Sequence, residues 1–257
     1  MRWQLTHAEG VLAGRPLSTV MACGGVLDDA PIAASVDAGQ ATDPASLADR
    51  LAPFWRGDVH NWLILPEAQR AHRDWWQNLA GSGPEPGFGR AQVALALKQM
   101  TSLQQPARLL AVDRVPLDEG WTDNVLALDW QPARQGLEFI WSQVDGRLDG
   151  KTDVGAMLEQ ACSAAPDPEV ILCPGNVSDG AIERLLPFMG SLASWAGPAV
   201  RWEFAEARVG PMGVVGGLYS WFWLHEGYRL GDWRHMAAII DMDQSPLVGL
   251  SLVNFRP

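Results

Sequence analysis

Cysteine is scarce in this sequence. The 257 residues contain only Cys23, Cys162 and Cys173, which lie far apart and form no CxxC pair. Three widely spaced cysteines match neither a disulfide framework nor a zinc-ligand pattern, so we expect no disulfide and no metal. We interpret all three as small core residues of a protein from a reducing compartment, and the cytoplasm is the simplest such compartment.

Long apolar runs and an excess of positive charge are also absent. The longest apolar stretch, residues 210–224, is shorter and richer in glycine than a membrane span of about 20 residues. The first residues lack the apolar centre of a signal peptide. The formal net charge is −11, which disfavours nucleic acid and anionic membranes as partners. We therefore expect a soluble protein with neither a membrane nor a nucleic-acid partner.

Several motifs of common enzymes are missing as well. The sequence contains no GxSxG, GxGxxG, GxxxxGK[ST] or HExxH, so a hydrolase elbow, a nucleotide site and a metalloprotease site have no support. His225 opens a segment, His-Glu-Gly-Tyr-Arg, that only resembles the start of HExxH. We interpret this histidine as a partner of a helix C-terminus rather than a catalytic group. We expect no cofactor.

Tryptophan, by contrast, is abundant. The chain has 13 tryptophans, and 47% of its residues are hydrophobic, enough for a sizeable core. Tryptophan is enriched at protein interfaces, but a core rich in tryptophan explains the same count. Arginine outnumbers lysine 17 to 2, which is typical of a GC-rich bacterial genome.

Apolar runs and helical periodicities alternate along the chain. We expect helices over residues 44–54, 70–79, 90–100, 153–162, 181–192 and 213–226. We expect strands over residues 3–6, 18–23, 62–65, 108–113, 124–130, 136–144, 170–173, 200–204, 236–242 and 248–254. The strand–helix order occurs twice, and each occurrence ends in a pair of strands. This alternation predicts a layered α/β protein.

Four local sequence patterns are informative because of the order in which they occur along the chain. Residues 94–114 lead from a helix into a strand like the one that ends in a "GVDS"-like turn of β-ketoacyl synthases. Residues 171–176 are similar to "ICDxNG", and Gly210–Gly217 is similar to "GxxGAAxG", a step into a central helix. Residues 231–253 are similar to the closing strand pair. Over about residues 90–253 the chain resembles the thiolase-like superfamily, to which the β-ketoacyl synthases belong.

This resemblance implies an architecture. The fold class is α/β, a thiolase-like layered α-β-α-β-α arrangement with two similar halves. Residues 1–257 would form a single thiolase-like domain, with pseudo-repeat halves at about 1–130 and 131–257.

The resemblance also shows what the chain lacks. A condensing enzyme needs a Cys nucleophile at a helix N-terminus and a His in its glycine-rich step. The matching residues here are Pro-Gly-Phe-Gly-Arg at 86–90 and Val-Gly-Pro-Met-Gly at 209–213, which contain neither. We therefore expect no catalytic residue, and a relic pocket formed by Phe88, Gly89, Asn176, Gly210, Met212 and Gly213.

Three functions remain open from the sequence. The first is a non-catalytic protein that acts through protein–protein interaction, as the inactive partner of a β-ketoacyl synthase-like chain or as an accessory or effector-loading factor of type VI secretion. Its partner would be a second copy, a related thiolase-like chain, a secreted effector or a secretion component. The second is a divergent acyl-CoA-dependent or acyl-carrier-dependent acyltransferase or condensing enzyme with relocated residues. The third is a binder of acyl chains or of an acyl carrier.

The resemblance implies an interface too. It places the strand after the nucleophile helix at a sheet edge that pairs across a two-fold axis. That strand, residues 109–113, is apolar and carries neither Lys nor an internal Pro, so an uncovered edge would be an aggregation liability. We predict an interface at Leu109, Leu110 and Val112.

Overall fold

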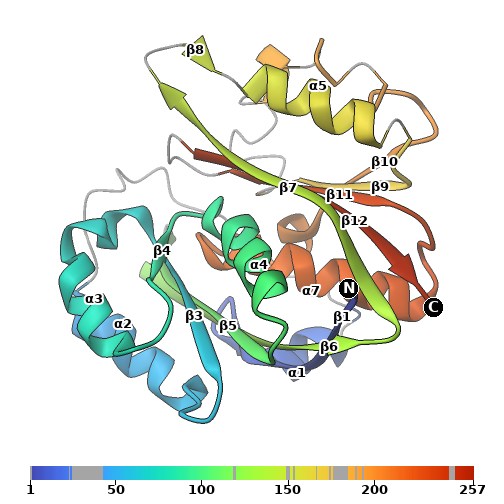
Figure 1. Ribbon diagram of the computed structural model, residues 1–257. Coiled ribbons are helices and arrows are strands. Elements are labelled where there is room, and N and C mark those ends of the chain that lie inside the picture. The colour runs from blue at the N-terminus through green and yellow to red at the C-terminus, as the bar shows by residue number, and fades with distance from the viewer. Residues whose placement is uncertain are drawn as a thin grey trace.

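The chain forms a layered structure in which helices alternate with β-sheet (Figure 1). The computed structural model describes residues 2–22, 24, 43–117, 120–148, 151–152, 154–165, 167–173, 175, 185–188, 190–192, 194–242 and 247–257. Cys23 and Asn176, two residues that the sequence singled out, lie outside the described residues.

Ten of the twelve described strands fall into two groups of five that follow the same order. The first group is β1 (Arg2–Leu12), β3 (His60–Leu65), β4 (Gly87–Phe88), β5 (Ala107–Leu117) and β6 (Gly120–Ala133). The second group is β7 (Gly136–Leu148), β9 (Val170–Cys173), β10 (Arg201–Phe204), β11 (Ala237–Met242) and β12 (Leu247–Arg256). The orders are β4-β3-β5-β6-β1 and β10-β9-β11-β12-β7, so each group runs third, second, fourth, fifth, first along the chain.

The strand directions of the two groups also agree. In each group the second strand is parallel to the third and to the fourth, and the fifth is antiparallel to its two neighbours. A short pairing of β1 with β7 links the groups, through Arg2 with Glu138 and Trp3 with Leu137. The short strands β2 (Arg15–Pro16) and β8 (Lys151–Thr152) pair with β1 and β7.

Helices cover both groups. Among the described residues, the α-helices are α1 (Leu17–Ala22), α2 (Pro44–Leu51), α3 (Arg73–Ala80), α4 (Gln92–Leu103), α5 (Val154–Ala164) and α7 (Val215–Leu230). Short 3-10 helices are η1 (Ala52–Phe54), η2 (Glu67–His72), η3 (Leu186–Phe188) and η4 (Ala205–Arg208). In Figure 1, α4 and α7 lie between the two groups of strands, α5 covers the second group from outside, and α2 and α3 lie beside the first.

Three hydrophobic clusters give the same layering. A central cluster joins α4 and α7 to both groups of strands, with Leu97, Leu218, Leu109 and Ile239 among its members. A second cluster packs α5 on the outer face of the second group, and a third packs α2 and Trp76 on the outer face of the first group. The order is therefore helices, sheet, helices, sheet, helices.

Helix α7 is almost wholly buried, as its sequence predicts. It is apolar nearly all round, and Leu218, Tyr219, Trp221 and Leu224 have no exposed surface. A helix without a polar face must be enclosed on all sides, and α7 packs against strands of both groups. It ends at Gly231, whose φ of 82° supplies the left-handed cap.

One predicted element is wrong. Residues 17–22 form helix α1 rather than a strand, and Leu17 and Val20 of this helix turn to the core with helical spacing. The helix expected over 181–192 lies partly outside the described residues. Its described part is helical at residues 185–188, which include the 3-10 helix η3, and forms turns at residues 190–192.

The predicted interface strand is wrong as well. Strand β5 lies inside its group, paired with β3 on one side and β6 on the other, so it is not a sheet edge. Leu109, Leu110 and Val112 have no exposed surface. An apolar strand without Lys or Pro is typical of a sheet interior as well as of a covered edge, and the sequence does not separate the two. The edges of the described sheet are β4 and β10.

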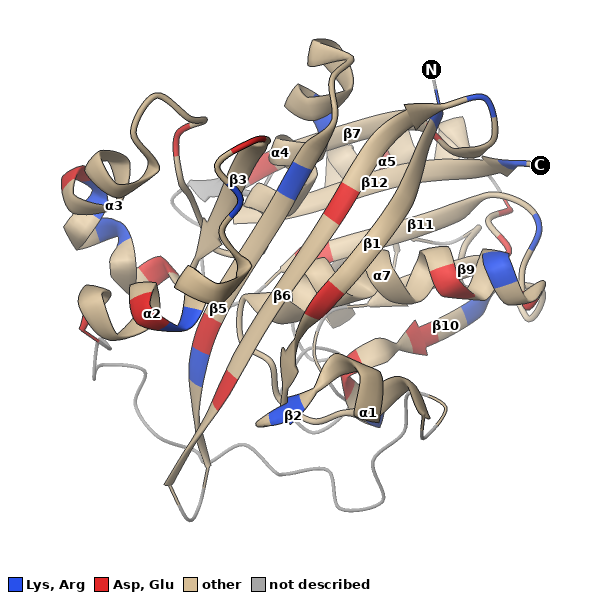
Figure 2. Ribbon diagram, turned by 90° about the horizontal axis from the view of Figure 1, so that it is seen from below, with Lys and Arg blue, Asp and Glu red and all other residues tan. Residues whose placement is uncertain are grey.

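Charged residues are mixed over the surface. In Figure 2, Lys and Arg positions are interspersed with Asp and Glu positions along the strands and helices that face the viewer. One arginine of β5, Arg108, is fully buried beneath η1 and binds Glu9, Asp129 and the carbonyl of Phe54. No helix among the described residues is long and apolar enough to cross a membrane.

Candidate functional site

Three segments that the sequence assigned to the relic pocket meet at one carboxylate. They are the residues before α4, the residues after β9, and the loop before α7 that contains Gly210–Gly213. The carboxylate belongs to Glu206 of η4, a short helix directly after β10. Its side chain is 2% exposed, so the site is an interior one.

Glu206 receives hydrogen bonds from all three segments. The two terminal nitrogens of Arg90 donate to its two oxygens, Nη2 to Oε2 over 2.8 Å and Nη1 to Oε1. The backbone N–H of Gly175 donates to Oε1 over 2.7 Å, and the backbone N–H of Met212 donates to Oε2 over 3.2 Å. Arg90 is buried too, with 7% of its side chain exposed. The site is thus a buried, bidentate ion pair supported by main-chain donors.

The loop before α7 is held from its other side by two residues of the first group. The N–H of Val214 donates to Asp113 Oδ2 over 2.8 Å, which places a carboxylate at the start of α7. The amide of Asn124 donates to the carbonyl of Pro211 over 3.3 Å. Gly213 has a φ of 56°, and a Cβ there would lie 1.9 Å from Asp113 Oδ2, so glycine is required for this close approach.

Phe88 does not join this arrangement. Its ring belongs to the outer cluster of the first group and lies against the guanidinium of Arg70, 5.4 Å from the ring centroid. Gly89 makes the turn into α4 with a φ of 90°, and its N–H donates to the carbonyl of Leu65 over 2.9 Å. The predicted relic pocket is therefore split, with Phe88 on the outer side and Met212 beside Glu206.

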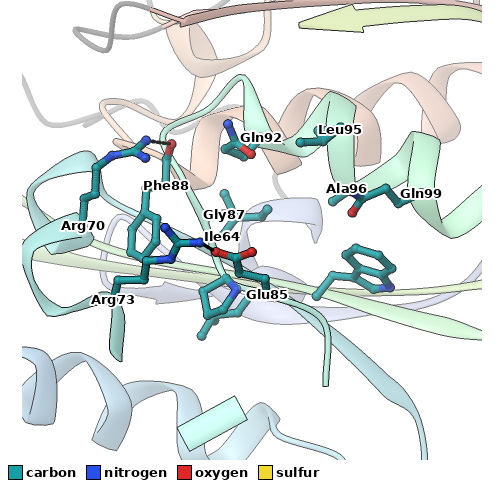
Figure 3. Close-up of a pocket in the computed structure, with 13 residues that line it drawn as sticks. Ile64, Arg70, Arg73, Glu85, Gly87, Phe88, Gln92, Leu95, Ala96 and Gln99 are labelled. Atoms are coloured by element: carbon teal, nitrogen blue, oxygen red, sulfur yellow. Dashed lines mark hydrogen bonds and ion pairs between the residues drawn. The ribbon is translucent and has the colours of Figure 1, made fainter. Parts of the chain in front are cut away.

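A cavity of about 180 Å³ borders Phe88. Figure 3 shows Arg70, Arg73 and Glu85 on one side of this cavity and the outward face of α4 on the other. The α4 face contributes Gln92, Leu95, Ala96 and Gln99. Arg70 donates to the carbonyl of Phe88 over 3.4 Å, and Arg73 pairs with Glu85. Gly210, Met212 and Gly213 do not line this cavity.

The described cysteines face away from Glu206. Cys173 ends β9, but its side chain packs in the outer cluster with α5, and burial raises the pKa of its thiol. Cys162 lies on α5, and burial is also the main cause that raises the pKa of this thiol. Neither thiol is set up to form a thiolate.

The histidine of α7 has other neighbours as well. His225 packs edge-on against Trp130 and pairs with Glu226. Burial lowers the pKa of its imidazole. Within the described residues no group of three or more His, Cys, Asp or Glu side chains could hold a metal ion.

Neither Arg90 nor Glu206 was predicted from the sequence as a site residue. Glu206 is an acidic residue at the start of a long apolar segment, which is a signal for a buried, paired carboxylate. Its partner lies 116 positions away, and no local pattern could have identified it.

Comparisons with known proteins bear on the fold. No protein-family model and no curated protein matches the sequence. Among solved structures, the chain is similar to an oxazolomycin ketosynthase domain from Streptomyces albus, with a TM-score of 0.63 and 12% identity, covering 99% of this chain and 95% of that one.

Two multi-chain structures are similar as well. A type II polyketide ketosynthase in complex with its acyl-carrier protein gives a TM-score of 0.62 and 8% identity, covering 99% of both chains. The ishigamide ketosynthase/chain length factor gives a TM-score of 0.54 and 11% identity, covering 100% of both chains. At such low identity these likenesses concern the fold alone. This chain therefore has the thiolase-like α/β fold found in ketosynthase condensing enzymes.

Proposed function

We propose that this chain is a non-catalytic thiolase-like protein that acts by binding a second protein chain. One observation carries the proposal: an Arg–Glu ion pair, Arg90 with Glu206, occupies the place where the segments of the expected active site meet. Among the described residues, the hydrogen bonds of Glu206 and of the loop 210–214 come from a guanidinium, a carboxylate, an amide and main-chain groups. None of these is a thiol, a hydroxyl or an imidazole.

The chemistry of condensation explains why this matters. An acyl-enzyme requires a nucleophile with a lowered pKa or an adjacent base, and an oxyanion requires hydrogen-bond donors that are free to meet it. Here the guanidinium and two main-chain N–H groups already bind Glu206. The alternative of an acyltransferase with relocated residues would need a nucleophile elsewhere in the chain.

We interpret the two groups of strands as the pseudo-repeat halves of one thiolase-like domain. Their common strand order and directions support this interpretation. The boundary would then fall between β6 and β7, at residues 134–135, because residue 130 lies within β6. The third option from the sequence, an acyl chain in the relic pocket, has less support because Phe88 and Met212 do not line one cavity.

For the partner we propose a second thiolase-like chain, as a homodimer or as a related protein. One of the similar structures is described as a ketosynthase in complex with an acyl-carrier protein, and another as a ketosynthase/chain length factor. A role as an accessory or effector-loading factor of type VI secretion stays a prediction from the resemblance. A secreted effector or a secretion component would be the partner in that role.

The surface that we propose for pairing is the β4 edge. Strand β4 spans only two residues and pairs with Ile64 and Leu65 alone, so most of the outer side of β3 has no strand paired to it. The cavity of Figure 3 adjoins it. Helix α3 exposes Trp75 and Leu79, with 40% and 45% of their surfaces accessible, and their i,i+4 spacing puts them on one face. Exposed aromatic and apolar groups beside an open edge favour association.

Light scattering on the purified chain tests the pairing. A homodimer gives twice the 28.0 kDa chain mass, and Leu95→Arg, on the α4 face of the cavity, should shift it to monomer. Leu230→Arg is the matched control, because Leu230 is 63% exposed at the end of α7. If the wild type is monomeric, affinity capture must recover a thiolase-like chain that Leu95→Arg loses and Leu230→Arg keeps. A monomer that captures no such chain contradicts the proposal.

A further inference from the structure

The carboxylate of Glu206 is saturated with donors. Each oxygen accepts one bond from the guanidinium of Arg90 and one from a main-chain N–H, that of Gly175 or Met212. An ionised carboxylate accepts about four hydrogen bonds. The four donors therefore match the full acceptor capacity of a single carboxylate, which is the property of a binding site and not only of an ion pair.

The donors are held in place by contacts of their own. The backbone of Arg90 is fixed at the start of α4, where its carbonyl accepts from the N–H of Val93 over 2.9 Å. Met212 lies in the loop that Asp113 and Asn124 hold from the opposite side. Gly175 follows β9, a strand paired on both sides. These anchors do not involve the carboxylate, so the two main-chain donors and the backbone of Arg90 should keep their positions when it is removed.

The surroundings also fit an anion. Arg90 and Met212 lie two and three residues before the first residues of α4 and α7, and helix N-termini favour negative charge. Gly216 provides the room, because a Cβ at this position would lie 2.3 Å from the carboxyl carbon of Glu206. With side-chain exposures of 7% and 2% for Arg90 and Glu206, water competes little for these donors.

We infer that Arg90, Gly175 and Met212 form a binding site for a small aliphatic carboxylate, and that Glu206 occupies it as an internal ligand. In the wild type the site is closed to external carboxylates. Replacing Glu206 by alanine removes one methylene and the carboxylate, which together have the same non-hydrogen atoms as acetate. The vacated site should therefore accept acetate. This inference rests on the contacts of Glu206 and does not depend on the proposed pairing.

Acetate binding to Glu206→Ala tests the inference. A ligand that binds only the folded state raises the midpoint of thermal unfolding, saturably and by mass action. For a chain of this size we expect a rise of about 2–4 °C at ten times the dissociation constant. Equilibrium dialysis with radiolabelled acetate should give one acetate per chain. If Glu206→Ala is unfolded alone, recovery of the fold in acetate is the readout.

Three controls keep the outcome decisive. At constant ionic strength, acetamide, which is neutral and of similar shape, should give less than a quarter of the acetate shift. Wild-type protein should not respond, and neither should the double variant Arg90→Met, Glu206→Ala, which lacks the guanidinium. An equal response of the double variant, or no acetate binding by folded Glu206→Ala, would overturn the inference.

Discussion

At the scale of single residues, the main feature is a charge pair in the interior. Removing a carboxylate and a guanidinium from water costs several kcal/mol per ion, and only good geometry and further hydrogen bonds offset that cost. Arg90 and Glu206 meet both conditions, with bidentate contact and two added main-chain donors. Each residue should therefore be intolerant of single substitution, although the pair as a whole adds little net stability.

A double-mutant cycle tests this description. Arg90→Met leaves a buried carboxylate without its counter-charge and should lower the free energy of unfolding by about 3–5 kcal/mol. Glu206→Gln leaves the guanidinium uncompensated and should cost a similar amount. The double variant should lose at least about 1 kcal/mol less than the sum, because no isolated charge remains. Urea denaturation gives all four values.

An exposed pair serves as the control for that cycle. Glu67 and Arg70 form an ion pair three residues apart, with 36% and 50% of their side chains accessible. Glu67→Gln with Arg70→Met should show a coupling of no more than about 0.5 kcal/mol. Additive losses at Arg90 and Glu206 would mean that the two groups do not form the buried pair described above.

The residue scale is also where the sequence is least informative. The absence of Cys and His from residues 86–90 and 209–213 can be read directly. What replaces them cannot, because Glu206 and Arg90 come together only when β10 and α4 pack around the same interior. Gly213 and Gly216 are a sequence signal of this packing, because Asp113 and Glu206 fill the space that side chains at these two positions would occupy.

At the scale of elements, buried strands and the central helix are well predicted. Strand β9 (Val170–Cys173) has the predicted bounds, and α7 is predicted because its run of apolar residues is too long for a buried strand. Helix α1 was missed because Thr19 and Val20 favour a strand locally, while the placement of Leu17 and Val20 against the core favours a helix. Position within the sheet was missed because β5 has the composition of a protected edge and of a central strand alike.

Helix α7 gives the prediction at this scale. Leu218 is fully buried in the central cluster, so Leu218→Ala should lower the free energy of unfolding by about 2–5 kcal/mol. Leu230→Ala on the same helix, at a position that is 63% exposed, should change it by less than about 0.5 kcal/mol. Chemical denaturation of both variants measures the difference. A loss at Leu218 as small as that at Leu230 would contradict the central position of α7.

At the scale of the whole molecule, the layered architecture follows from the alternation of helices and strands. The resemblance to β-ketoacyl synthases indicates which layered fold it is. The order of motifs over residues 90–253 predicts the thiolase-like fold that the comparisons support. The interface could not be located from the sequence, because which strand ends at an edge depends on pairing between segments far apart in the chain. The structure moves the candidate edge from β5 to β4.

We proposed that this thiolase-like chain performs no acyl transfer. Incubation of the folded protein with acetyl-CoA, malonyl-CoA and octanoyl-CoA, followed by intact-mass spectrometry, tests it most directly. Burial raises the pKa of both described thiols, and Glu206 occupies the hydrogen-bond donors of Arg90, Gly175 and Met212. We therefore predict that the folded protein carries no more acyl adduct than a control sample that is unfolded before it meets the acyl-CoA. One acyl group per folded chain, mapped to a single residue, would contradict the account.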